Sequence, residues 1–231
     1  MDRTLWPAII GLLALFGIFE TTGLDLWVQD HFYDFTTHAW LVDHDAPLAR
    51  MVFYTGPKAL IWILAIALLG LACIPAAWRA RLPFPRLENR DLWIVIGTLA
   101  ISPLLIATGK ATTNVFTPHE TRRYDGFAPY VKVIEAYPDG DRPTKHGRGF
   151  PAGHASGGFA LMALAGLAKT SRGRWLGVAI GLGTGSAMGL YQIFKGAHYL
   201  SHTVVSALLC WIVFLVLRKL FRADVKPRAA G

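Results

Sequence analysis

Apolar residues in this chain fall into six long runs separated by polar segments. A helix needs about 20 apolar residues to cross the hydrocarbon core of a membrane. The predicted spans are 5–24, 59–78, 92–109, 149–168, 175–194 and 196–217. The fourth is the least apolar because it contains His154. The pattern predicts an all-α, six-transmembrane helix bundle, formed by a single integral membrane domain over residues 1–231.

The charges between these runs predict an orientation. Lys and Arg gather in the loop after the second run, the loop after the fourth and the C-terminal tail, whereas Asp dominates the first loop. Basic loops favour the cytoplasmic side, so both termini are expected in the cytoplasm. No small-residue cleavage site follows the first run, which is therefore expected to remain as a helix. The segment 110–150 is basic although this arrangement places it outside, so its cations need another role.

Composition agrees with a membrane protein. Hydrophobic residues make up 53% of the chain and charged residues 16%, whereas soluble domains have about 25% charged residues. The net charge of +8 does not indicate a nucleic-acid partner, because the basic residues cluster at the ends of apolar runs and not on a soluble face. Cys73 and Cys210 lie inside apolar runs and are expected to behave as small hydrophobic residues.

Three histidines are candidates for chemistry at the predicted outer face. His198 and His202 are four residues apart and would share a helix face, so His202 is placed to fix the tautomer of a nucleophilic His198. His154 follows Pro-Ala-Gly, a turn that leaves backbone N–H groups near Gly153 free to bind an anion. Its imidazole can donate a proton to a leaving oxygen. The alternative is ordinary hydrogen bonding in packed helix ends.

Two other chemistries fit the pattern less well. The spacing of His198 and His202 occurs in zinc-binding helices, but Tyr199 stands where that motif requires Glu, and no further ligand set is visible. We therefore expect no metal and no other cofactor. Ser156 with a histidine would make an intramembrane serine protease, but the Gly-x-Ser-Gly pattern is absent because His154 occupies the place of the first Gly.

Lys110, Arg122 and Arg123 supply cations to the same predicted face. Arginine offers a planar fork for phosphate oxygens, and lysine offers a compact charge. Alternatively, these residues form a solvated basic loop attracted to anionic headgroups. Together with the histidines, however, they predict a phosphate site.

These three segments, in this order, resemble the signature motifs of the type 2 phosphatidic acid phosphatase family. Lys110 matches the Lys that opens the first motif, and Arg123-Tyr124-Asp125-Gly126 resembles its later part in a bacterial subgroup that has Cys-Pro-Trp where this chain has Thr117-Pro118. By this resemblance Arg123 is the phosphate ligand in preference to Arg122. Residues 150–154 match the second motif except that Ala152 replaces Ser, and His198 matches the nucleophile of the third.

The resemblance implies a six-helix membrane fold with an outer-face loop that carries part of the active site. It implies His198 as nucleophile, His154 as general acid, and Lys110, Arg123 and Gly153 as phosphate ligands. Gln192 and His202 stand where the third motif has Arg and Asp. Lys195 is expected to compensate for the charge that Gln192 lacks, and His202 to hold the nucleophile.

The implied substrate is a lipid phosphate in the bilayer, such as phosphatidylglycerol phosphate, an isoprenyl diphosphate or a lipid A phosphate, cleaved at the outer face of a bacterial inner membrane. Two alternatives stay open. One is a phosphotransferase that passes the phosphate to a second lipid. The other is a non-catalytic lipid-binding or transport protein, which the departures at Ala152, Gln192 and His202 favour.

Overall fold

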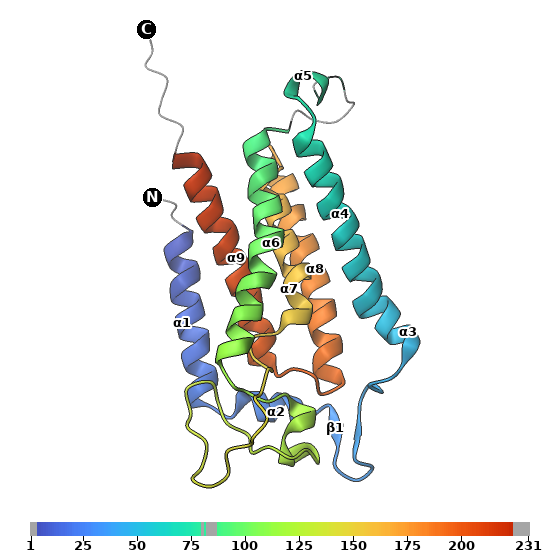
Figure 1. Ribbon diagram of the computed structural model, residues 1–231, viewed down its shortest axis with the longest axis vertical. Coiled ribbons are helices and arrows are strands. Elements are labelled where there is room, and N and C mark those ends of the chain that lie inside the picture. The colour runs from blue at the N-terminus through green and yellow to red at the C-terminus, as the bar shows by residue number, and fades with distance from the viewer. Residues whose placement is uncertain (1–3, 80, 82–86, 224–231) are drawn as a thin grey trace.

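The computed structural model describes residues 4–79, 81 and 87–223 (Figure 1). The remaining residues, 1–3, 80, 82–86 and 224–231, belong to the expected domain of residues 1–231 and to the predicted cytoplasmic loop and tail; they lie outside the described part. Helices account for 68% of the structure and strands for 3%. The fold is therefore mostly helical, as predicted.

Long helices run alongside one another and form the body of the protein (Figure 1). They are α1 (Leu5–Thr21), α4 (Gly56–Cys73), α6 (Asn89–Thr112), α8 (Ser171–Phe194) and α9 (Leu200–Ala223), with the shorter α7 (Gly153–Ala160) packed among α6, α8 and α9. The start of α1 and the end of α9 lie at the same end of the bundle (Figure 1). The connections at the opposite end build the candidate site.

Short elements join the long ones. Between α1 and α4 lie α2 (Leu24–Asp30), an antiparallel pair of strands β1 (Tyr33–Asp34) and β2 (Ala39–Trp40), α3 (Pro47–Arg50) and the π-helical η1 (Met51–Thr55). Between α4 and α6 lies α5 (Ala76–Arg79). The segment between α6 and α7 holds the 3₁₀ turns η2 (Pro118–Glu120) and η3 (Arg122–Tyr124), and η4 (Leu161–Gly166) continues α7.

Within the described residues, four helical segments are long and apolar enough to cross a membrane: Pro47–Cys73, Asn89–Thr112, Ser171–Phe194 and Leu200–Phe221. A fifth is added if α1 and α2, which meet at 72°, are counted as one bent span. These helices indicate an integral membrane protein. The predicted number of six spans is not confirmed.

The first predicted span, 5–24, qualifies only as part of this bent pair, and the fourth, 149–168, accounts for the rest of the difference. Residues 149–152 are not helical, and the helix from Gly153 to Gly166 consists of α7 followed by the 3₁₀ segment η4. Its rise of about 24 Å is shorter than the hydrocarbon core of about 30 Å. The segment is surrounded by other helices, and irregular backbone is tolerated at membrane depth when protein covers it.

The last predicted span also needs a correction. We expected a helix over 196–217 with His198 on its face, but α9 begins only at Leu200. His198 lies in the turn between α8 and α9. Gly196 makes this turn with a φ of 72°, a left-handed conformation that glycine adopts without strain. Helical spacing is therefore not what relates His198 to His202.

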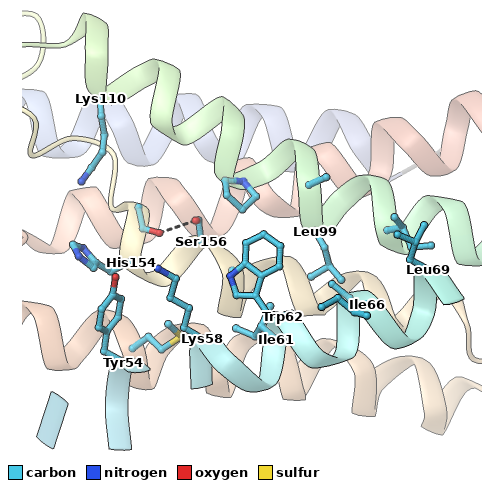
Figure 2. Close-up of a pocket in the computed structure, with 17 residues that line it drawn as sticks. Tyr54, Lys58, Ile61, Trp62, Ile66, Leu69, Leu99, Lys110, His154 and Ser156 are labelled. Atoms are coloured by element: carbon cyan, nitrogen blue, oxygen red, sulfur yellow. Dashed lines mark hydrogen bonds between the residues drawn. The ribbon is translucent and has the colours of Figure 1, made fainter. Parts of the chain in front are cut away.

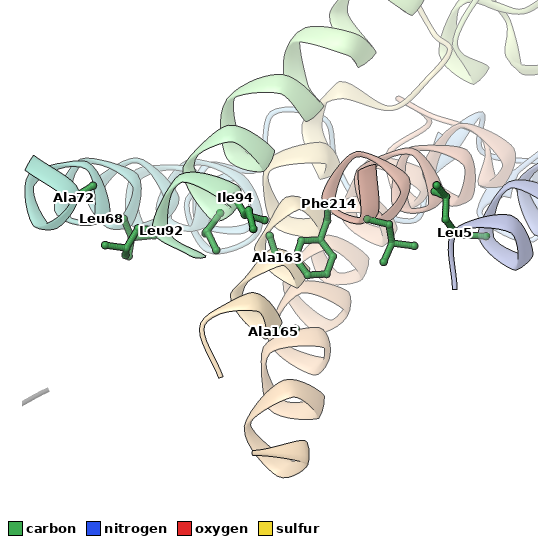
Figure 3. Close-up of a cluster of buried hydrophobic side chains, with 11 residues drawn as sticks. Leu5, Leu68, Ala72, Leu92, Ile94, Ala163, Ala165 and Phe214 are labelled. Carbon is green, nitrogen blue, oxygen red and sulfur yellow. The ribbon is translucent and has the colours of Figure 1, made fainter. Parts of the chain in front are cut away.

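Glycines spaced four residues apart let α8 lie very close to the α7–η4 segment. A Cβ on Gly177 would lie 2.4 Å from the Ala165 nitrogen, and one on Gly181 would lie 2.2 Å from the Met162 nitrogen. Close approach through small residues is a common way for membrane helices to pack. Behind this contact, Ala163 and Phe214 belong to a cluster of buried apolar side chains (Figure 3).

Gly181→Ala is expected to destabilise the protein, because its Cβ would overlap the Met162 backbone and such overpacking costs about 1–3 kcal/mol. Gly183→Ala is the matched control: nothing lies within 4 Å of a Cβ at Gly183 on the same helix, so this change should be neutral or slightly stabilising. Thermal unfolding of both variants in detergent would test the contact. Equal melting temperatures would contradict the packing described.

Candidate active site

Three imidazoles form a chain of contacts at the end of the bundle opposite the start of α1. Nδ1 of His154 lies 3.1 Å from Nε2 of His198. Nδ1 of His198 lies 3.4 Å from Nδ1 of His202. His198 and His202 are almost fully buried, at 1% and 2% exposure. The rings thus contact one another in a line, with His198 in the middle.

The turn that carries His198 is held from both sides. The Gln192 carbonyl accepts hydrogen bonds from the N–H groups of Ala197, at 2.8 Å, and His198, at 3.3 Å. The Gly196 carbonyl accepts from the His119 N–H at 2.9 Å and lies 3.0 Å from the His119 ring. The segment between α6 and α7 therefore fixes the nucleophile candidate through its backbone.

His154 is the second residue of α7, and the chain before this helix is tied to α6 and α9. The Thr113 hydroxyl donates to the Phe150 carbonyl at 2.7 Å, and the Ala152 N–H donates to the His202 carbonyl at 3.0 Å. Ala152 is the N-cap and offers no side-chain cap. The first N–H groups of a helix have no partner within it, so those of Gly153 and His154 can bind an acceptor from outside the helix.

Three lysines surround His154 and act electrostatically on its ring: Lys110, Lys195 and Lys58, in decreasing order. A Cβ on Gly153 would lie 3.6 Å from the Lys110 ammonium, which places this charge at the start of α7. The Lys195 ammonium lies 4.9 Å from the centre of the Tyr191 ring, and burial, followed by the charge of Arg50, lowers the Lys195 pKa. None of the ion pairs in the described part of the chain includes any of the three lysines.

Arg123, the predicted phosphate ligand of the first motif, is paired with Asp30 of α2. Its Nε and Nη2 donate to the two carboxylate oxygens at 2.8 and 2.7 Å, and its guanidinium lies 5.8 Å from the centre of the Phe35 ring. Arg122 is paired in the same way with Asp141. The structure therefore brings Lys110 to the histidines and leaves both arginines bound to carboxylates.

Gln192 is buried at 1% exposure, close to the histidine turn. Its backbone carbonyl holds that turn, as described above. Its side-chain Oε1 is buried without a hydrogen-bond partner among the described residues. A buried acceptor without a donor is costly, and this one marks the position where the resembling family has Arg.

A cavity of about 580 Å³ opens from His154 along α4 and α6. At one end Lys110, His154, Tyr54 and Lys58 gather; towards the other end the lining becomes apolar (Figure 2). The apolar part includes Ile61, Trp62, Ile66, Leu69 and Leu99. Helical rise puts Leu69 about 16 Å from Lys58 along α4. The cavity thus joins a cationic head to a long apolar channel.

Tyr54 and Lys58 also line this cavity, and neither was predicted from the sequence. The Tyr54 ring meets His154 edge-on, with centroids 5.0 Å apart, and the Lys58 ammonium lies 5.5 Å from the centre of the Tyr54 ring. One signal was available: Lys58 is a positive charge at the predicted outer end of an apolar run, against the usual charge bias.

A model of the PAP2 superfamily matches residues 91–226, which is more than half of the 231 residues. Neither the curated proteins nor the solved structures give a match. The matched region contains Lys110, Gln192, Lys195 and the three contacting histidines, whereas α4 with Lys58 lies before it. The resemblance seen in the three motifs is thereby confirmed, and the chain belongs to the PAP2 superfamily.

Proposed function

We propose that this protein is a membrane lipid phosphatase that works through a phosphohistidine on His198. Membership of the PAP2 superfamily supports phosphatase activity on phosphate esters. The observation that carries the finer proposal is the chain of three imidazoles, whose first member, His154, lies with Lys58 and Lys110 at the head of an apolar cavity.

His198 suits the role of nucleophile. Burial, reinforced by the charge of Lys110, holds the pKa of His198 well below its usual value of 6.5. The ring is therefore neutral at neutral pH, and protonation removes its lone pair only under more acidic conditions. When Nδ1–H of His198 donates towards His202, the lone pair of Nε2 faces His154, where a phosphoryl group would enter. His202 thus takes the orienting place that Asp has in the family, without supplying a negative charge.

The proposed reaction has two steps. Nε2 of His198 forms a bond to phosphorus while the bond between phosphorus and the lipid oxygen breaks. His154, which takes up a proton together with the phosphate dianion that offsets the surrounding lysines, transfers this proton to that oxygen. Water then attacks the phosphorus, gives its proton to His154 and releases phosphate as the N–P bond breaks. An in-line displacement separates the attacking and leaving atoms, so the entering phosphoryl group replaces the contact between His154 and His198 seen in the free protein.

Positive charge and backbone N–H groups would stabilise the non-bridging oxygens. Lys110, Lys195 and the start of α7 at Gly153 surround the place between the two reacting histidines, and fixed donors in a buried site stabilise developing charge strongly. Gln192 contributes no charge. Arg123 would join them only after releasing Asp30, so its proposed role as phosphate ligand depends on a rearrangement of the outer segment.

The cavity supports a lipid substrate. Its apolar part lies along α4, most of whose residues are exposed on the outside of the bundle, so acyl or isoprenyl chains would enter from the bilayer while the phosphate reaches the histidines. The charge distribution along the chain supports cytoplasmic termini and a site at the outer face of a bacterial inner membrane. We propose that the whole chain, including α1 to α4, acts as one membrane domain.

The test is phosphate release by the purified protein in detergent from phosphatidic acid, phosphatidylglycerol phosphate, farnesyl phosphate and farnesyl diphosphate. We expect at least one lipid to be hydrolysed, with the same rate after EDTA treatment, because the proposed steps use histidine and water alone. Inorganic phosphate as the main product supports hydrolysis, whereas a phosphorylated second lipid would identify a phosphotransferase. No phosphate release from any of these lipids would overturn the proposal.

A further inference from the structure

Lys58 is a lysine inside a membrane-spanning segment. It belongs to the candidate span Pro47–Cys73, where an ionisable side chain is costly and is a candidate for function. Its side chain reaches into the cavity between Tyr54 and Trp62, beside His154 (Figure 2). Lys58 therefore lies at the border between the cationic head and the apolar channel.

The cations of the outer segment are neutralised by protein carboxylates, whereas those around His154 are not. Arg122, Arg123 and Lys145 pair with Asp141, Asp30 and Glu120 respectively. Lys58, Lys110 and Lys195 form no ion pair within the described residues, and the charges that act on His154 are all positive. A single phosphate monoester carries about two negative charges, whereas three lysines act on His154.

We propose that Lys58 binds a second phosphate on the substrate, the one that remains with the lipid after cleavage. The inference rests on the phosphatase function proposed above and narrows its substrate class to lipids with two phosphates near the cleaved bond. A lipid diphosphate and a phosphatidylglycerol phosphate share this chemistry.

The position of Lys58 fits the leaving side of the reaction. For a diphosphate, the bond between the terminal phosphorus and the bridging oxygen breaks, and the lipid monophosphate takes the proton from His154. The phosphate that remains on the lipid stays negatively charged. It would lie beside Lys58, between the cleaved bond and the lipid tail in the apolar channel. A lysine here would stabilise that charge, and such charge-assisted contacts are stronger than neutral ones.

Lys58→Gln tests this role, with Lys58→Arg as the variant that keeps the charge. Lys145→Gln removes a cation that is paired with Glu120 outside the cavity and serves as the matched control. The kcat/KM values are compared within two substrate pairs: farnesyl diphosphate with farnesyl phosphate, and phosphatidylglycerol phosphate with phosphatidic acid. Binding of a farnesyl bisphosphonate and the farnesyl monophosphonate is measured on the same proteins, so the role of Lys58 is tested even without turnover.

We expect Lys58→Gln to lower the preference for the two-phosphate lipid by about 10-fold or more, and to weaken bisphosphonate binding but not monophosphonate binding. Lys58→Arg and Lys145→Gln should keep the preference. A loss with farnesyl diphosphate alone would assign Lys58 to diphosphates, and a loss in both pairs would assign it to any second phosphate.

If Lys58→Gln changes kcat/KM equally for both substrates of each pair, or for neither, the inference is overturned. The phosphatase function would then stay in place. Absence of turnover in the unaltered protein would instead reject the phosphatase function. In that case unchanged discrimination between the two phosphonates would also reject the role of Lys58.

Discussion

His198→Ala is expected to abolish phosphate release, with a loss of about 10⁴-fold or more, as is typical when a covalent nucleophile is removed. His154 and His202 contact opposite nitrogens of the His198 ring, so neither is placed to attack the phosphorus from the side of His198. The measurement is the initial rate of phosphate release from the best lipid substrate, together with trapping of an acid-labile phosphoprotein by rapid quenching.

His146→Ala is the control for losing an imidazole without touching the site. Its ring contacts the adjacent Gly147 carbonyl in the outer segment, so activity and phosphoprotein yield should stay unchanged. Both variants should elute and unfold like the unaltered protein, because His198 is held by its backbone N–H as well as its ring. Retained turnover or a retained phosphoprotein in His198→Ala would place the covalent bond on another residue.

The long apolar runs predicted most of the helical framework because membrane helices must be apolar over their full length. Runs 92–109 and 175–194 became α6 and α8, each extended by a few residues at one or both ends. The run 149–168, which contains His154, forms only a short helix. Its helix is shortened because residues 149–152 are bound to α6 and α9 at the site, and these are tertiary contacts that no local pattern reveals.

The site was predictable where its residues lie in motifs and unpredictable where distant segments meet. The motif spacing brought His154, His198, His202 and Lys110 into one group, and the structure places them together. Arg123 was predicted from the same kind of match, but its pairing with Asp30 comes from a fold that brings α2 beside η3.

The position of Lys58 beside His154 could not be predicted from the charges in the sequence. It precedes the region that matches the superfamily, and in sequence it looks like the flank of a membrane helix. Only the packing of α4 against α6 and α7 turns it towards His154.

His154→Asn is expected to separate the two proposed steps. Asparagine keeps a polar group near the place of Nδ1 but cannot transfer a proton, and loss of general acid–base catalysis costs about 10²–10⁴-fold. Lipid phosphates, whose leaving alkoxides need a proton, should lose this much activity. Nitrophenyl phosphate has a leaving group that is stable without a proton, so its first step should be nearly unaffected.

With nitrophenyl phosphate, the His154→Asn protein should therefore release about one nitrophenol per active site rapidly and then stall, because the phosphohistidine lacks the base that activates water. Rapid-mixing absorbance records the burst, and the stalled phosphoprotein should carry its label on His198. The matched control is His31→Asn, whose ring contacts the Trp27 carbonyl on α2 and should leave both phases unchanged. Equal losses on alkyl and aryl phosphates without a burst would mean that His154 positions the phosphate and transfers no proton, because only a proton-transfer role makes the defect depend on the leaving group.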